Sequence, residues 1–114
     1  MAHFSFLVMA KPQAGREAEW EAWHRRHVED VLKVPGFVSC RRFCAAEFQP
    51  PGAEPRWSFA VLYELQTDDV EASIAELRRR AGTDVMPMSS ASDPGKTVSI
   101  VLKQLSEHSR KVEE

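Results

Sequence analysis

The stretch that decides the fold is WEAWHRRHVEDVLKVPGF, residues 20–37. Its aromatic and apolar side chains recur every three or four residues, which predicts an amphipathic helix over residues 16–34 with one face directed to the interior. Pro35 disfavours helix at the residue before it, and Gly36 completes the stop. The face directed inward consists of Trp20, Trp23, His27, Val31 and Val34. An ionisable histidine ring therefore lies on the face that the helix buries, and this needs an explanation.

Outward from this helix, short runs of apolar and β-branched residues separated by turn residues predict four strands. A second helix is expected to begin with Thr67 or Asp68 as its N-cap and to end at Gly82. Polar and Pro- or Gly-rich segments predict loops at 49–55 and 83–96 and a polar tail at 106–114. The expected strands are 3–10, 37–48, 56–65 and 97–105.

The order of these elements is β-α-β-β-α-β, the split arrangement of ferredoxin-like folds. We therefore predict an α+β fold in a single domain of residues 1–105, with two helices on one face of a four-stranded antiparallel sheet. The strands offer apolar side chains to both faces, as Phe4 and Phe6 do against Leu7. A second apolar face needs a cover, and pairing with an identical chain is the commonest solution, which predicts a homodimer.

Composition excludes several classes of protein. The net charge of −2 gives no general attraction to nucleic acid or to an anionic membrane. No apolar run approaches the roughly 20 residues that span a bilayer, and the segment FSFLVMA lacks the basic flank of a secretion signal, so we expect a cytoplasmic protein. The RNA-recognition strand motif is absent, and the loop AKPQAG has no cysteine for a metallochaperone.

The cysteines predict neither a disulfide nor a zinc site. Cys40 and Cys44 are four residues apart in an expected strand, which places their Cα atoms about 13 Å apart, too far for a disulfide. His24 and His27 have the i, i+3 spacing of a ligand pair, but Glu21 is expected on another face, so we predict no metal.

His27 is the first candidate for chemistry. It lies between Trp23 and Val31 at steps of four, so its ring should face the sheet, where a partly buried imidazole can exchange a proton at neutral pH. The alternative is a core histidine satisfied by a backbone carbonyl or by Tyr63. His24 lies off the centre of the stripe, and exposure among Arg25 and Glu21 is favoured over a place at the pocket rim.

Tyr63, in the third strand, can donate a hydrogen bond to a substrate carbonyl or enolate oxygen if its face is the helix side. Alternation along the second strand sends Arg41 and Arg42 to opposite sides, so one of them can meet a substrate carboxylate, although an interface salt bridge is the competing interpretation. We expect an apolar pocket walled by Trp20, Trp23, Trp57 and Phe59. For each of these residues the alternative is plain packing in the core.

The motif W-x-x-W-H-x-x-H running into VLKVPGFVSCRRF resembles the dimeric α+β barrel superfamily, in particular its EthD-like members. The resemblance implies that two sheets pack into a barrel and that each subunit holds its ligand between sheet and helices. It places His27 at the recurring helix histidine and His24 where an aromatic residue often stands. The superfamily includes polyketide cyclases, cofactor-free monooxygenases, haem-degrading enzymes, dehydratases and isomerases, so the resemblance implies the fold more closely than the reaction.

Three functional hypotheses follow. The first is a cofactor-independent acid–base enzyme of the cyclase, isomerase, dehydratase or lyase type, acting on a hydrophobic, aromatic or polyketide-like molecule, with His27 and Tyr63 as catalytic residues. The second is a cofactor-free monooxygenase, and the third is a non-catalytic ligand-binding dimer. A haem enzyme is disfavoured, because residues 3–10 lack the asparagine that the haem-degrading members carry.

Overall fold

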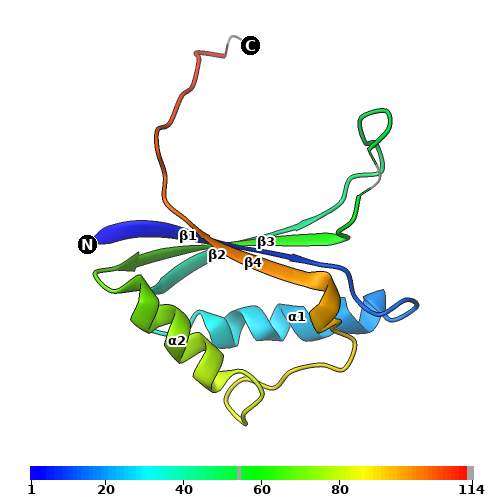
Figure 1. Ribbon diagram of the computed structural model, residues 1–114, viewed down its shortest axis with the longest axis horizontal. Coiled ribbons are helices and arrows are strands. Elements are labelled where there is room, and N and C mark those ends of the chain that lie inside the picture. Colours follow the sequence, from blue (N-terminus) through cyan, green and yellow to red (C-terminus); the bar gives the residue numbers. More distant parts are fainter. Residues whose placement is uncertain (54, 113–114) are drawn as a thin grey trace.

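The computed structural model describes residues 1–53 and 55–112 and contains the predicted β-α-β-β-α-β order (Figure 1). Residue 54 of the expected loop and residues 113–114 of the expected tail lie outside the described residues. Neither described α-helix has the length and apolar character that crossing a membrane requires. The elements are β1 (Ala2–Ala10), α1 (Glu17–Val31), β2 (Phe37–Cys44), β3 (Phe59–Thr67), α2 (Val70–Arg80), the 3-10 turn η1 (Pro94–Lys96) and β4 (Thr97–Leu102).

The four strands form one antiparallel sheet in the order β2-β3-β1-β4. Strand β1 pairs with β3 along its whole length, from Ala2 opposite Thr67 to Ala10 opposite Phe59. Strand β2 contains a bulge between Phe37 and Ser39, where its pairing with β3 shifts by one residue. This fold, with two helices on a four-stranded antiparallel sheet, confirms the predicted ferredoxin-like α+β architecture.

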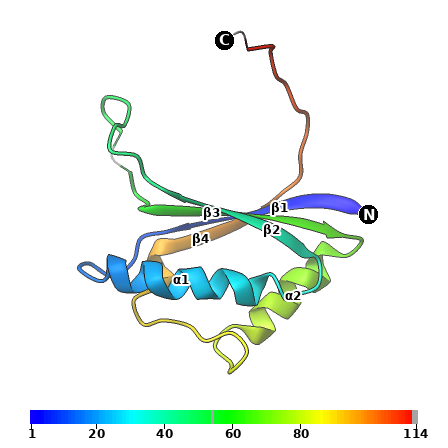
Figure 2. The same ribbon diagram turned by 180° about the vertical axis from the view of Figure 1, so that it is seen from behind.

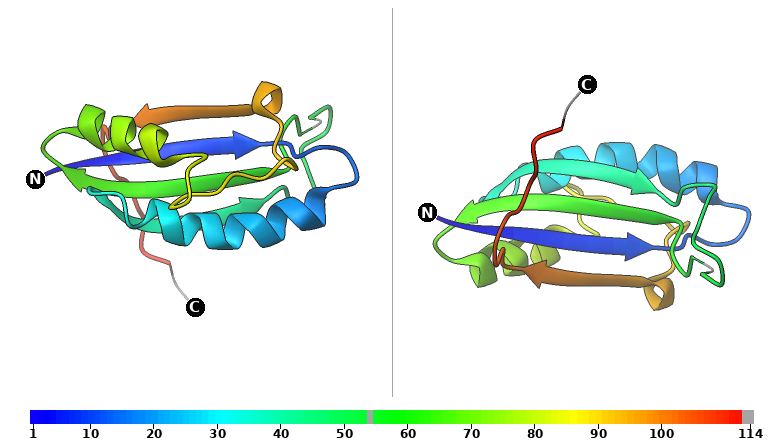
Figure 3. Two further views of the ribbon diagram at one scale, coloured as in Figure 1. Left: turned by 90° about the horizontal axis from the view of Figure 1, so that it is seen from below. Right: turned by 90° about the horizontal axis from the view of Figure 1, so that it is seen from above.

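Helices α1 and α2 form one layer against one face of the sheet (Figures 1 and 2). The core lies between the two layers, because alternate strand side chains and one stripe of each helix point into this space. Figure 3 shows the helical layer on its left and the opposite sheet face, free of helices, on its right. The buried residues of the main core cluster are Phe6, Val31, Val34, Phe37, Val61, Tyr63, Leu65 and Met86.

The sheet face away from the helices is apolar and has no cover within the described chain. Six large hydrophobic residues of β2 and β4 are at least 38% exposed, and five of them lie on this face; the sixth, Val101, is opposite the core residue Phe6. The β2–β3 connection and the chain after β4 both extend on this side of the sheet (Figures 1 and 2). The expectation that apolar side chains occupy both faces is therefore met. The five residues are Val38, Phe43, Val98, Ile100 and Leu102.

Several predicted boundaries differ from the structure. Helix α1 ends at Val31, three residues early, because the chain passes into tight turns in which Val34 N–H donates to the Val31 carbonyl. The N-cap of α2 is Asp69, whose side chain accepts from Ala72 N–H at 3.0 Å, and not Thr67 or Asp68. Strands β2 and β4 end earlier than predicted, and β3 begins three residues later.

Gly36 is required where α1 turns into β2. Its φ is +98°, in the region that side-chain-bearing residues avoid, and a Cβ atom there would collide with Ser73 Oγ of α2. The Pro-Gly stop therefore does more than end the helix. It allows the backbone to pass closely beneath α2 and to enter the sheet beside β3.

Candidate active site

A cavity of about 390 Å³ lies between α1 and the sheet, where the sequence predicts a pocket. Helix α1 supplies one wall, β1 and β3 supply the floor, and α2 with the 83–96 loop closes the remaining sides. The lining is mostly apolar, and the cavity volume lies in the range of small-molecule sites. Its polar side chains are His24, His27, Tyr63, Arg78, Ser92 and Thr97.

His27 lines this cavity and stacks on Trp23, with ring centroids 4.6 Å apart. Its Nδ1 atom is the only fully buried side-chain nitrogen or oxygen without a hydrogen-bond partner in the described residues. Burial lowers the pKa of the His27 imidazole, and the nearby Asp30 carboxylate partly opposes this. The ring is therefore neutral at pH 7 and can accept a proton. The competing idea of a core histidine satisfied by a carbonyl or Tyr63 does not describe this geometry.

Tyr63 faces the helix side, which answers the question that the sequence left open. The side chain is only 2% exposed and lines the same cavity as His27. Its hydroxyl makes no hydrogen bond within the described residues, and burial is the main cause that raises its pKa. The phenol thus keeps its proton at neutral pH and offers a hydrogen-bond donor in an apolar cavity.

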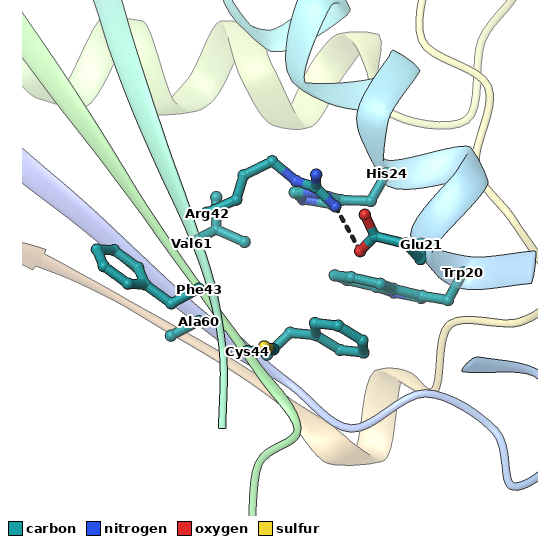
Figure 4. A pocket seen from close by; sticks show the side chains of 9 residues that line it. Trp20, Glu21, His24, Arg42, Phe43, Cys44, Ala60 and Val61 are labelled. Carbon is teal, nitrogen blue, oxygen red and sulfur yellow. Dashed lines mark hydrogen bonds and ion pairs between the residues drawn. The ribbon is translucent and has the colours of Figure 1, made fainter. Parts of the chain in front are cut away.

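His24 is 4% exposed, so the expectation of a solvated side chain was wrong. Its ring stacks on Trp20 with a centroid separation of 4.5 Å and an interplanar angle of 8°. Arg42 reaches back from β2 and donates from Nε to His24 Nδ1 at 3.1 Å, while its Nη2 pairs with Glu21 at 2.6 Å. Glu21 was expected to point elsewhere, but Figure 4 shows it beside Arg42 and His24.

A smaller cavity of about 170 Å³, whose lining Figure 4 shows, lies next to the main one. Glu21 and Arg42 line the smaller cavity, and both cavities share Trp20 and His24. Burial is the largest cause that lowers the pKa of His24 to about 3, with the charges of His27 and Arg42 acting in the same direction. His24 is therefore a neutral side chain at physiological pH.

The structure brings some of the predicted pocket walls together and separates others. Trp20 and Trp23 line the main cavity, whereas Phe59 stacks on Trp20 at 4.5 Å and faces only the smaller one. Trp57 lies before the start of β3 and lines neither cavity, so its predicted place in the pocket wall was wrong.

The two arginines point to opposite sides, as the alternation predicts. Arg42 meets His24, while Arg41 lies 3.9 Å from Glu64 with 67% of its side chain exposed. Glu64 also accepts hydrogen bonds from His3 and Ser5 on the face away from the helices. Arg41 therefore belongs to the open sheet face and is remote from His27.

The loop 83–96 forms a fixed wall of the cavity. Met86 is fully buried, and Trp23 Nε1–H donates to the Pro87 carbonyl at 2.9 Å. Arg16, just before α1, donates to the Ser90 carbonyl at 3.1 Å. The loop is therefore held at two points, by Trp23 within α1 and by Arg16 at its N-terminus. The sequence predicts a loop here but assigns no residue of it to the site.

Sequence reasoning also missed Arg78, Ser92 and Thr97 as lining residues. Arg78 lies in the last turn of α2, and the position of α2 over the cavity depends on tertiary packing. Within residues 1–53 and 55–112, no group of three or more metal-ligating side chains occurs. Cys40 and Cys44 are both free thiols, as predicted.

Neither a protein-family model nor a curated protein matches the sequence. Solved structures do match it. An EthD-like protein from Ralstonia eutropha JMP134 has 14% identity and a TM-score of 0.66, over 96% of this chain and 97% of that one. The cofactor-independent oxygenase SnoaB from Streptomyces nogalater has 13% identity and a TM-score of 0.60, over 94% and 97%.

A dimeric ferredoxin-like protein of unknown function from Jannaschia sp. CCS1 has 15% identity and a TM-score of 0.59, over 90% of this chain and 100% of that one. The haem-degrading protein MhuD from Mycobacterium tuberculosis is also similar, with a TM-score of 0.62 at 12% identity. At such identities these likenesses establish architecture and leave the reaction open. The chain has the ferredoxin-like α+β fold that these solved structures share.

Proposed function

We propose that this protein is a cofactor-independent acid–base enzyme acting on a hydrophobic, aromatic or polyketide-like small molecule in the cavity between α1 and the sheet. The observation that carries the proposal is the buried, unpartnered His27 Nδ1 on the wall of that cavity. A buried polar atom without a partner costs stability, so its persistence favours a functional use.

In the proposed reaction, neutral His27 removes a proton from the substrate and returns it to the product, as a cyclase, isomerase, dehydratase or lyase requires. Tyr63 donates a hydrogen bond to the substrate oxygen on which negative charge develops. The apolar lining excludes water, which strengthens both interactions. Trp20 and Trp23 offer aromatic surfaces against which a planar substrate can pack.

A cofactor-free monooxygenase is an equally supported second candidate. Proton removal by His27 would generate a substrate carbanion, and molecular oxygen would then be the co-reactant that it meets. The same fold in a cofactor-independent oxygenase supports this candidate. A non-catalytic ligand-binding protein is the third candidate, because a cavity of this kind also suits storage or transport of a small molecule.

We also propose that two copies pair through the open sheet face. The exposed apolar residues of β2 and β4 favour burial, and an isologous contact is the commonest way to achieve it. The similarity to a dimeric ferredoxin-like protein supports this assembly. Replacing Leu62 near the middle of that face by Glu should yield a folded monomer in sedimentation analysis; a dimer that persists would argue against this interface.

Native mass spectrometry of the protein purified from its own host, followed by denaturation, tests the proposal. A releasable organic adduct on a dimer would support the cavity and identify the substrate class, whereas a haem adduct would overturn the cofactor-independent proposal. The identified compound is then supplied to wild type and His27→Gln, with His108→Gln in the exposed tail as control. We expect only His27→Gln to abolish turnover while remaining folded.

Labelled oxygen separates the first two candidates. Incorporation of the label into product would favour the monooxygenase, and turnover under anaerobic conditions would favour the acid–base enzyme. Release of the compound unchanged, with no turnover by wild type, would contradict both enzymatic proposals and leave the binding protein.

A further inference from the structure

Two histidines line one cavity, but their surroundings give them different chemistry. The His24 and His27 ring centroids are 5.8 Å apart; His24 is buried and His27 is half-buried. His27 has a ring nitrogen with no partner, whereas His24 has one ring nitrogen occupied by Arg42. The proposed function uses only His27. The fixed contact between Arg42 and His24 at the cavity wall has no role in it.

The Arg42 contact determines which nitrogen of His24 carries the proton. A guanidinium group has only donors, so the nitrogen that receives the Arg42 Nε–H at 3.1 Å must present a lone pair. That nitrogen is Nδ1, and neutral His24 consequently carries its proton on Nε2. Nε2 makes no hydrogen bond within the described residues and is not among the fully buried unpartnered atoms, so it keeps some accessible surface.

The same contact opposes the cationic form of His24. A proton on Nδ1 would face the Arg42 N–H at hydrogen-bond distance, and two positive charges would meet in a buried site. Glu21 holds Arg42 in place through the 2.6 Å pair, so the guanidinium cannot easily turn away. The charged or titratable groups that face His24 or share its two cavities are Glu21, His27, Arg42, Cys44, Tyr63 and Arg78.

We propose that Arg42 acts as a positioning residue that fixes His24 as a neutral Nε2–H donor, and that His24 donates to the substrate oxygen that becomes negative. This deepens the proposed function and rests on it. His27 takes the proton, the electron pair moves onto the oxygen as an enolate or phenolate, and the His27 imidazolium returns the proton to the product. The substrate is therefore a hydrophobic molecule with a carbonyl group next to an acidic C–H group, and its enolate is a phenolate where the ring becomes aromatic.

Nuclear magnetic resonance of the ring nitrogens tests the role of Arg42 without any substrate. Long-range proton–nitrogen correlations should show wild-type His24 protonated at Nε2 alone at pH 7 and still neutral at pH 4. In Arg42→Met, Glu21 stays and the cation is gone, so the His24 midpoint should rise by about one pH unit or more. Arg41→Met, on the opposite sheet face, should leave the His24 signals unchanged.

A wild-type His24 protonated at Nδ1, or an Arg42→Met protein whose His24 titrates as in wild type, would overturn the assignment. Arg42→Lys is a useful second variant, because an ammonium can also donate to Nδ1. It should preserve the Nε2–H form, which separates loss of the donor from general damage to the fold.

Binding of 4-nitrophenol tests the role of the Nε2–H group. Its phenolate absorbs visible light, so the fraction of bound probe in each form can be measured directly. Wild type should favour the phenolate, and His24→Phe should weaken phenolate binding relative to the neutral phenol by about 10- to 100-fold, the range for one hydrogen bond to a charged acceptor. Equal preference in the two proteins would overturn the donor role of His24.

Failure of the donor role of His24 can be distinguished from failure of the proposed function. If the protein proves non-catalytic, turnover is absent while the Nε2–H tautomer and the phenolate preference remain. If His24 is not a donor, wild type lacks the phenolate preference or His24→Phe leaves it unchanged, whether or not His27 supports turnover.

Discussion

Replacing His24 by Phe should remove a defined part of the acid sensitivity of the fold. The reason is that His24 is neutral in the folded protein down to a pKa of about 3, whereas the unfolded chain takes up the same proton at its ordinary value of 6.5. Between these values the unfolded state binds more protons, so the free energy of unfolding falls as the pH falls. Phe keeps the aromatic packing on Trp20 and does not titrate.

The magnitude follows from the two values. At pH 5 the unfolded chain is almost fully protonated at His24, whereas the folded chain is almost unprotonated there. Proton uptake therefore stabilises the unfolded state in proportion to the roughly 1.5 pH units between pH 5 and the unfolded-state pKa of 6.5. This corresponds to about 2 kcal/mol of stability that wild type loses between pH 8 and pH 5 because of His24. The lowered pKa of His27 adds to the loss but is present in both proteins.

Urea unfolding followed by tryptophan fluorescence at a fixed protein concentration measures this loss. The drop in unfolding free energy from pH 8 to pH 5 should be about 2 kcal/mol smaller in His24→Phe than in wild type. The absolute stability of the variant is not the readout, because Arg42 Nε also loses its acceptor. His108→Gln, in the exposed tail, should show the wild-type drop. A His24→Phe protein with the wild-type drop would refute the reasoning.

Three further predictions concern the scaffold that holds the site. Gly36→Ala should destabilise the fold by more than the roughly 1–3 kcal/mol that backbone strain alone costs, because a Cβ atom there also collides with α2. Gly52→Ala is the matched control in thermal denaturation, since Gly52 has a φ of +83° but open space around its Cα. Asp69→Ala should cost about 1 kcal/mol in urea unfolding through loss of the α2 cap. Trp23→Phe should cost about 1 kcal/mol and speed amide hydrogen exchange in residues 83–93, because one anchor of that loop is lost.

Much of the fold was predictable because its signals are local and repeated. The α1 stripe places Trp20, Trp23 and His27 on one side at steps of three and four, and that side does face the sheet. The strands and their antiparallel order follow from apolar runs and short connections. The direction of Tyr63 could not be decided from alternation alone, because both faces of β3 are apolar and only the packed helices distinguish them.

The errors occur where position depends on contacts between distant segments. His24 lies off the centre of the α1 stripe, and one of the groups that pack around it is Arg42, which is 18 residues away on β2. Trp57 fits the period-two pattern of β3 by its spacing, but the strand begins only at Phe59, so the pattern extends beyond the element. The place of Arg78 depends on where α2 lies over the sheet, which no local pattern encodes.

The bulge in β2 explains why Arg42, and not Arg41, reaches His24. Phe37 is buried on the helix side, so strict alternation would send Ser39 and Arg41 to that side and Arg42 to the open face. The pairing shift between Phe37 and Ser39 inserts one residue and reverses this assignment for the rest of the strand. The extra residue in β2 thus places Arg42 on the helix side and Arg41 on the open face, and the polarity of the cavity wall depends on this placement. Deleting Val38 should therefore remove the bulge without exchanging the two arginines, because Ser39 then follows Phe37 directly and still pairs with Glu64. The wild-type His24 nitrogen signals should be retained, and their loss would show that the bulge itself holds Arg42 against His24.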